Sequence, residues 1–181
     1  MNNMQWFNEP AQWQATQDGV RLNTDAKTDF WRKTHYGFIR DNGHFYFQDV
    51  GRNFVAQGKF SGQYRDLYDQ AGLMLRVDET TWMKCGVEFV NGVQQASVVM
   101  TREYSDWSVT PLHDNPSAIW FRVVGKLPAV EMYYSLDGTS YTMLRMGYLA
   151  DVDHLHVGMM ACSPDGKGFE VVFEEFSVSL E

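Results

Sequence analysis

Hydrophobic and polar residues alternate along most of this chain, and turn residues separate the alternating runs. The clearest stretch, residues 69–107, holds three such runs divided by two short polar turns. A period of two residues predicts β-strands with two different faces. One face of these runs is unusually polar. The pattern therefore indicates an antiparallel sheet whose second face carries side chains capable of chemistry.

The same signals recur through the rest of the chain, whereas helical periodicity is confined to single turns at residues 28–33 and 66–69. The predicted strands cover residues 45–48, 53–61, 69–77, 82–90, 96–102, 117–126, 129–136, 140–146, 154–161 and 169–180.

Local signals predict how some of these strands turn and bend. Asn91-Gly92 and Asp137-Gly138 are typical of two-residue type I′ hairpin turns, which need positive φ at both central positions. In the last strand the hydrophobic phase slips by one residue around Glu174-Glu175. A slip of this kind predicts a β-bulge.

Many short strands with tight turns predict an all-β fold, either a sandwich or a barrel. The length of 181 residues favours two large packed antiparallel sheets, in a jelly-roll sandwich. Linkers, low-complexity segments and internal repeats are absent from the sequence. We therefore expect residues 1–181 to form one domain.

A set of short motifs, in fixed order, resembles a known family. The motifs are DQAGL at 69–73, WMKCGVE at 82–88, SDWS at 105–108, YSLDG at 134–138 and GMMACSP at 158–164. Together they resemble the largely uncharacterised domain family of regulation-of-enolase-like proteins, from about residue 6 to residue 178. The resemblance implies a concanavalin A-like lectin and glucanase fold, similar also to the sandwich domain of some β-xylosidases. In relatives of this fold the concave sheet holds sugars.

Composition and charge narrow the classes of partner. The net charge of −8 argues against nucleic acid and against anionic membranes, because both need a basic surface. No apolar run approaches the ~20 residues that span a bilayer, and the first residues do not resemble a secretory signal. We therefore expect a cytoplasmic protein, in which Cys85 and Cys162 are buried free thiols.

The polar face of the strands is the candidate ligand site. It mixes acids, bases, an amide and tryptophan, which favours a small polar ligand such as a sugar over a lipid. The alternative is an ordinary solvated face with cross-strand ion pairs. The candidate ligand-binding residues are Asp69, Gln70, Arg76, Lys84, Glu88, Arg102, Asp106, Trp107, Trp120 and Arg122, with Asp106 and Trp107 expected in a loop after a strand.

Catalysis has weaker support. Glycosidases of the resembled fold alternate acids along a concave strand, whereas the comparable strand here offers Glu88 alone. Hydrolysis would need a second carboxylate near it, from Asp69, Asp106 or Glu131. Nucleophile elbows, phosphate loops and dinucleotide fingerprints are missing from the sequence, so no catalytic residue or cofactor is assigned.

A metal site is not expected either. His154 and His156 share one strand face, but no third and fourth ligand follows at a spacing typical of zinc.

The predicted function is non-catalytic binding of a carbohydrate or related polar metabolite on the concave sheet. Two alternatives stay open: a glycoside-acting enzyme that uses Glu88 with a second carboxylate, and a regulatory module that binds another protein. A monomer and a homodimer both fit the sequence.

Overall fold

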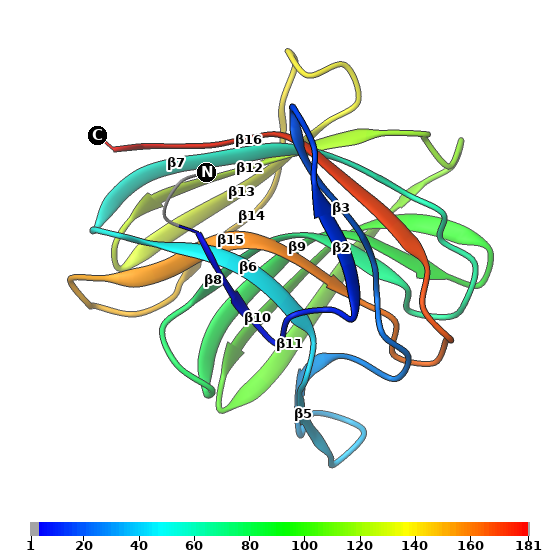
Figure 1. Cartoon of the computed structure of the whole chain (residues 1–181). Helices are drawn as coiled ribbons and strands as arrows, with labels where there is room; N and C mark the ends of the chain where they lie inside the picture. Colours follow the sequence, from blue (N-terminus) through cyan, green and yellow to red (C-terminus); the bar gives the residue numbers. More distant parts are fainter. Residues whose placement is uncertain (1–3, 181) are drawn as a thin grey trace.

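Two antiparallel sheets stack face to face in the computed structural model, which describes residues 4–180 (Figure 1). The first seven-stranded sheet runs in the order β1 (Gln5–Phe7), β6 (His44–Val50), β15 (Leu155–Cys162), β8 (Gln70–Arg76), β9 (Thr81–Val90), β10 (Val93–Arg102) and β11 (Tyr104–Leu112). The second runs in the order β14 (Thr142–Tyr148), β13 (Ala129–Ser135), β12 (Ile119–Lys126), β7 (Asn53–Gly62), β16 (Glu170–Leu180), β3 (Gly19–Asn23) and β2 (Gln12–Ala15).

This architecture confirms the predicted all-β sandwich, and each predicted run coincides with a strand. The alternation did not reveal the first five strands or β11. The two expected helical turns are wrong, because residues 28–33 contain strand β4 (Phe30–Arg32) and residues 66–69 form an irregular turn. Across residues 4–180 there is no helix that could cross a membrane.

The Asn91-Gly92 turn and the bulge are confirmed. Asn91 and Gly92 have φ of 52° and 86°, as a type I′ turn requires. In β16 the register against β7 shifts between Glu174 and Ser177, and Glu175 adopts a φ of 55°. The extra residue lets Phe173 and Phe176 both pack toward the core despite the change of phase.

The Asp137-Gly138 turn differs from the prediction. Gly138 has a φ of 75°, but Asp137 is not in the left-handed region. Instead the Asp137 carboxylate accepts hydrogen bonds from the backbone N–H groups of Thr139 and Ser140, at 2.8 and 2.7 Å. These bonds hold the pKa of Asp137 well below its ordinary value and close a longer loop than a two-residue hairpin.

The main hydrophobic core lies between the two sheets. Alternate residues of the central strands fill it, among them Leu73 and Leu75 of β8 and Phe121 and Val123 of β12. Cys85 belongs to this core, and both cysteines are buried free thiols as predicted. Burial raises the pKa of each thiol.

A second, smaller core covers the outer face of the first sheet, the face directed away from the second sheet. It includes Phe45, Met74 and Trp82 from the sheet. Phe30 and Trp31 of β4 lie over them. Strand β4 pairs with β5 (Ile39–Asp41), and this short hairpin extends beneath the sandwich (Figure 1). We call residues 30–41 the arm.

Two glycines let the strands under the arm approach closely. Gly72 of β8 and Gly86 of β9 are opposite each other in the register. A Cβ atom added to Gly86 would lie 2.2 Å from the carbonyl oxygen of Ala71, and one added to Gly72 would lie 2.0 Å from that of Cys85. Both contacts are with backbone, so a larger residue can be accommodated only if a strand moves.

Gly86→Ala should therefore destabilise the protein by about 1–3 kcal/mol, the usual cost of overpacking a well-packed interior. Urea denaturation followed by fluorescence measures the change. The matched control is Gly51→Ala, whose Cβ atom would come no closer than 3.9 Å to its nearest neighbour, the Asp153 carbonyl oxygen. Equal denaturation midpoints for the two variants would contradict the close approach of β8 and β9.

Candidate functional site

A pocket of about 190 Å³ lies between the arm and the outer face of the first sheet. We call it the arm pocket. It is lined by Asp29, Trp31, Tyr36, Phe38, Arg40, Tyr68, Gln70, Lys84, Glu88, Trp107, Pro164 and Asp165.

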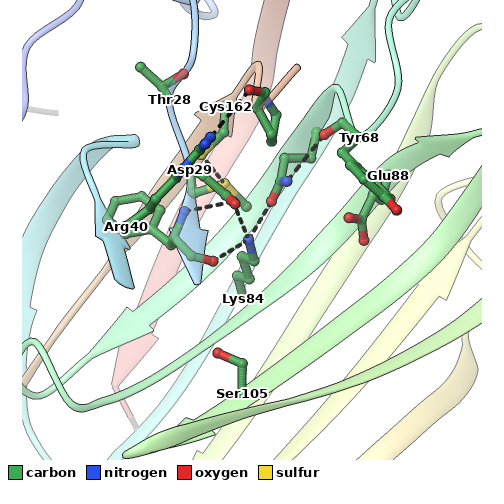
Figure 2. A network of polar contacts seen from close by, with 12 residues as sticks. Thr28, Asp29, Arg40, Tyr68, Lys84, Glu88, Ser105 and Cys162 are labelled. Carbon is green, nitrogen blue, oxygen red and sulfur yellow. Dashed lines mark hydrogen bonds and ion pairs between the residues drawn. The ribbon is translucent and has the colours of Figure 1, made fainter. Parts of the chain in front are cut away.

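Lys84 attaches the arm to the floor of this pocket (Figure 2). Its buried ammonium group donates to the Phe30 carbonyl oxygen at 2.7 Å, to Gln70 Oε1 at 2.6 Å and to Asp29 Oδ1 at 3.3 Å. A lysine has three N–H donors, so all of them are engaged inside the protein. The charge of Lys84 is compensated by Asp29.

A second, partly buried ion pair fixes the other strand of the arm. Arg76 of β8 donates two hydrogen bonds to the Asp41 carboxylate, at 2.9 and 2.7 Å, and its guanidinium group lies over the ring of Phe7. Burial raises the pKa of Asp41, while Arg76 acts in the opposite direction. The main chain of the arm is also bound to the sheet, since the Arg32 N–H donates to Ser105 Oγ at 3.0 Å.

Glu88 lies on the same face of β9 as Lys84, four residues along the strand, so their Cα atoms are roughly 13 Å apart. Its Oε2 atom accepts hydrogen bonds from Ser97 Oγ at 2.7 Å and from Trp107 Nε1 at 2.8 Å. No hydrogen bond or ion pair within residues 4–180 involves its Oε1 atom. Burial raises the pKa of the Glu88 carboxyl, and the charge of Lys84 opposes this shift in part.

Aromatic rings form two walls above these polar groups. On the arm, Trp31 contacts Tyr36 edge to face and Tyr36 stacks on Phe38, with centroids 5.7 and 5.4 Å apart. On the opposite side, Tyr68 and Trp107 meet edge to face at 6.2 Å. A hydrogen bond between the Tyr36 and Tyr68 hydroxyls, 3.1 Å apart, joins the two walls and raises the pKa of Tyr68 to about 12.

The backbone that presents these rings is unusual. Lys33 and His35 in the arm, and Tyr68 in the opposite wall, have φ of 59°, 63° and 66°. A side chain in this left-handed region costs of order 1–3 kcal/mol, and such residues are concentrated at ligand-binding sites.

The structure brings four of the predicted ligand-binding residues together: Gln70, Lys84, Glu88 and Trp107 all line the arm pocket. Trp107 does so from within β11, where it pairs with Val99, and not from a loop as expected. Its indole N–H points to Glu88 because the two residues lie on the same face of the sheet.

Asp69 and Arg76 lie near the arm pocket without lining it. Arg76 is engaged by Asp41, as described. Asp69 is fully buried, and its carboxylate accepts hydrogen bonds from the backbone N–H groups of Arg65 and Asp66 and from Ser163 Oγ, the last at 2.6 Å. It therefore connects the loop before β8 with the loop after β15, at the start of β8.

The expected position of Arg102 on the polar face is wrong, and so is that of Asp106 in a loop, because Asp106 lies within β11. Both side chains lie on the same face of the sheet as Met100, which faces the main core. They are nevertheless exposed, because they lie at the edge of the first sheet. The Arg102 guanidinium group lies 5.4 Å from the ring centroid of Tyr148 in the second sheet.

The expected grouping of Trp120 and Arg122 with Glu88 is also wrong, because both belong to β12 of the second sheet. Trp120 Nε1 donates to Glu175 at 2.9 Å, and Arg122 Nε donates to Gln57 at 3.0 Å. Alternation shows which residues of a strand share a face, but it does not show which sheet contains the strand.

The acids proposed as partners of Glu88 are likewise dispersed. Asp69 and Asp106 do not line the arm pocket, and Glu131 lies in β13 of the second sheet. The carboxylates that do line it with Glu88 are Asp29 and Asp165.

Sequence reasoning missed most of the aromatic lining and both of these acids. The signal that could have revealed the aromatic residues of the arm was their mixture with polar residues, WRKTHYGFIRD at 31–41. That segment has neither strand nor helix periodicity, since its pattern reflects a short hairpin over a sheet.

No group of three or more His, Cys, Asp and Glu side chains that could hold a metal occurs within residues 4–180. His156 pairs with Asp49 at 3.0 Å and lies against the ring of Phe47.

Comparison with known proteins gives close relatives and more distant structural neighbours. The chain is 40% identical over 174 residues to "Regulation of enolase protein 1" of Saccharomyces cerevisiae, covering 96% of this chain and 88% of that protein. A crystal structure described as a functionally unknown protein from Saccharomyces cerevisiae has a TM-score of 0.95 and 38% identity, with 99% of this chain and 97% of that chain covered.

Two neighbours below 25% identity share the fold. The GH43 BlXynB protein from Bacillus licheniformis has a TM-score of 0.76 at 16% identity, covering 99% of this chain but 37% of that one. Lectin I-B4 from Griffonia simplicifolia has a TM-score of 0.57 at 12% identity, covering 99% and 94%. The fold is therefore of the concanavalin A-like lectin type, as the motifs implied.

Residues 6–180 match the family described as "Protein of unknown function (DUF1349)". With a match across almost the whole chain and a yeast relative at 40% identity, this chain belongs to the DUF1349 family.

Proposed function

We propose that the arm pocket binds a carbohydrate or a related small polar ligand without reacting with it. The observation that carries the proposal is the Oε1 atom of Glu88, which has no hydrogen-bond or ion-pair partner among residues 4–180 and lies at the floor of a pocket with aromatic walls. Sugars need such a combination, because their hydroxyl groups donate hydrogen bonds and their C–H faces pack on aromatic rings.

The size of the pocket limits the ligand. Sites for drug-sized molecules have volumes of roughly 300–1,000 Å³. The arm pocket, at about 190 Å³, is smaller and suits a single sugar ring or a molecule of similar size. The likeness to a lectin and to a GH43 protein supports this class of ligand at the level of the fold.

A glycoside-acting enzyme is the second candidate, and the raised pKa of Glu88 favours it. A buried carboxyl against a tryptophan is a typical general acid. The second carboxylate would be Asp29 or Asp165, and Asp29 is already paired with Lys84. Release of nitrophenol from p-nitrophenyl glycosides, lost in Glu88→Gln and in either Asp29→Asn or Asp165→Asn, would replace the binding proposal with this one.

Trp107→Ala should weaken sugar binding at least tenfold, because it removes one wall of the arm pocket and a hydrogen bond to Glu88. Binding is measured by thermal shift against a panel of monosaccharides and sugar phosphates, followed by calorimetric titration of each sugar that raises the melting temperature. Trp120→Ala is the matched control, since Trp120 also donates its indole N–H to a glutamate but lies on the second sheet. This control should bind as the natural protein does.

Equal losses in the two tryptophan variants would place the site outside the arm pocket. If no sugar binds at all, the proposal fails, and a protein partner, as the name of the yeast relative suggests, becomes the better hypothesis.

The ionisation of Glu88 should also be visible in the stability of the protein without ligand. Because burial raises its pKa above the ordinary 4.5, the folded state loses stability relative to the unfolded chain as pH rises from the ordinary pKa through the raised one. Glu88→Gln keeps an acceptor for Ser97 and Trp107 but has no charge to bury. The melting temperature of Glu88→Gln minus that of the natural protein should therefore increase as pH rises through this window. Above the window the difference should stay constant. A constant difference from about pH 4 to pH 8 would show that Glu88 does not titrate with a raised pKa.

A further inference from the structure

The charges around the arm pocket are unequally compensated. Two basic side chains line it, Lys84 and Arg40. Lys84 has its three donors engaged and its charge paired with Asp29. Arg40 lies in the arm, where its guanidinium group stacks 4.7 Å from the ring centroid of Phe38 and donates to the Pro164 carbonyl oxygen at 3.4 Å.

Glu88 is therefore the buried charge of the pocket that lacks an opposite charge. Within residues 4–180 it forms no ion pair, and its two hydrogen bonds come from neutral donors, Ser97 and Trp107. Figure 2 shows the Glu88 carboxylate apart from the contacts that converge on Lys84. A buried carboxylate in this situation is costly unless a cation or several strong donors reach it.

A ligand hydroxyl would give Glu88 a hydrogen bond but would leave its charge uncompensated. A ligand ammonium group would supply both a hydrogen bond to the carboxylate and the opposite charge that Glu88 lacks. The attraction between the two charges is also larger in a pocket screened from water than at an exposed surface.

The walls of the pocket favour the same kind of ligand. Trp31, Tyr36, Tyr68 and Trp107 line it beside Glu88. The faces of aromatic rings carry negative electrostatic potential and attract ammonium groups that lie within about 6 Å. Asp165, at the exposed edge of the pocket, adds a further negative charge.

We propose that the ligand of the arm pocket carries a positively charged amino group, which binds Glu88 Oε1 and packs against these rings. The inference rests on the proposed function of the pocket and narrows its ligands to amino sugars and other small polar amines.

The test compares ligands that differ only in this group. D-glucosamine, D-galactosamine and D-mannosamine are titrated by calorimetry, each beside its parent hexose and its N-acetyl derivative, which has no charge. The cross-peak of the Trp107 indole N–H in NMR spectra reports binding at Glu88 and is assigned with Trp107→Phe. At least one hexosamine should bind tenfold or more tightly than both of its neutral counterparts and should shift the Trp107 signal.

In Glu88→Gln that tenfold advantage of the hexosamines over their neutral counterparts should disappear, because glutamine carries no charge to pair with the amino group. The comparison of charged with acetylated ligands uses the natural protein, so it holds even where the variant folds poorly. Neutral hexoses that bind as tightly as hexosamines would overturn the inference and leave the proposed function intact. An amino-group advantage that survives in Glu88→Gln would also overturn it. Absence of binding by every sugar would count against the proposed function itself.

Discussion

The buried ammonium group of Lys84 is the interaction on which the candidate site depends. Its bonds to Asp29, the Phe30 carbonyl oxygen and Gln70 connect β9, β8 and the start of the arm. Breaking a buried ion pair by removing one partner typically costs 3–5 kcal/mol, because the other charge is left uncompensated. The arm is a two-stranded hairpin, which has little stability of its own in water. It is ordered by this network and by the small core under Phe30 and Trp31.

The hydrogen bonds of Lys84 have two consequences. By holding the arm, Lys84 positions the arm's aromatic residues opposite Tyr68 and Trp107, so that a pocket exists between them. It also has no donor left for Glu88, four residues further along the same strand. The charge of Glu88 is therefore available to a ligand, although a basic residue lies on the same face of β9. Cross-strand ion pairs on this face were the alternative that the sequence left open.

The limits of prediction from the sequence are physical. Alternation with a period of two predicted the longer strands apart from β11, together with their inward faces and the bulge at Glu175, because these features are visible in the order of apolar and polar residues within one strand. It also identified Gln70, Lys84 and Glu88 as polar residues on one face, whereas it expected Trp107 in a loop. It could not place β12 in the second sheet, since strand order is a tertiary property, and so it grouped Trp120 with residues on the opposite side of the molecule.

The arm was missed for a different reason. Its residues pack on the outer face of a sheet whose inner face already covers the main core. Strands β8 and β9 therefore have both faces buried, and the polar residues of their outer faces are covered by a segment from far away in the sequence. The short hairpin that covers them has three residues in each strand and left-handed residues in its turn, so no period is visible.

Amide hydrogen exchange across the arm in the natural protein and in Lys84→Met tests this dependence most directly. Met keeps the aliphatic length of the side chain and removes the ammonium group. Amides that hold the arm, such as those of Lys33 and Gly43, donate to Phe38 and Asp29 and should exchange much faster in the variant. Those at the centre of β9 and β10 should keep their protection. Unchanged protection in residues 30–41 would contradict the role of Lys84, and would mean that packing on Phe45, Met74 and Trp82 alone holds the arm in place.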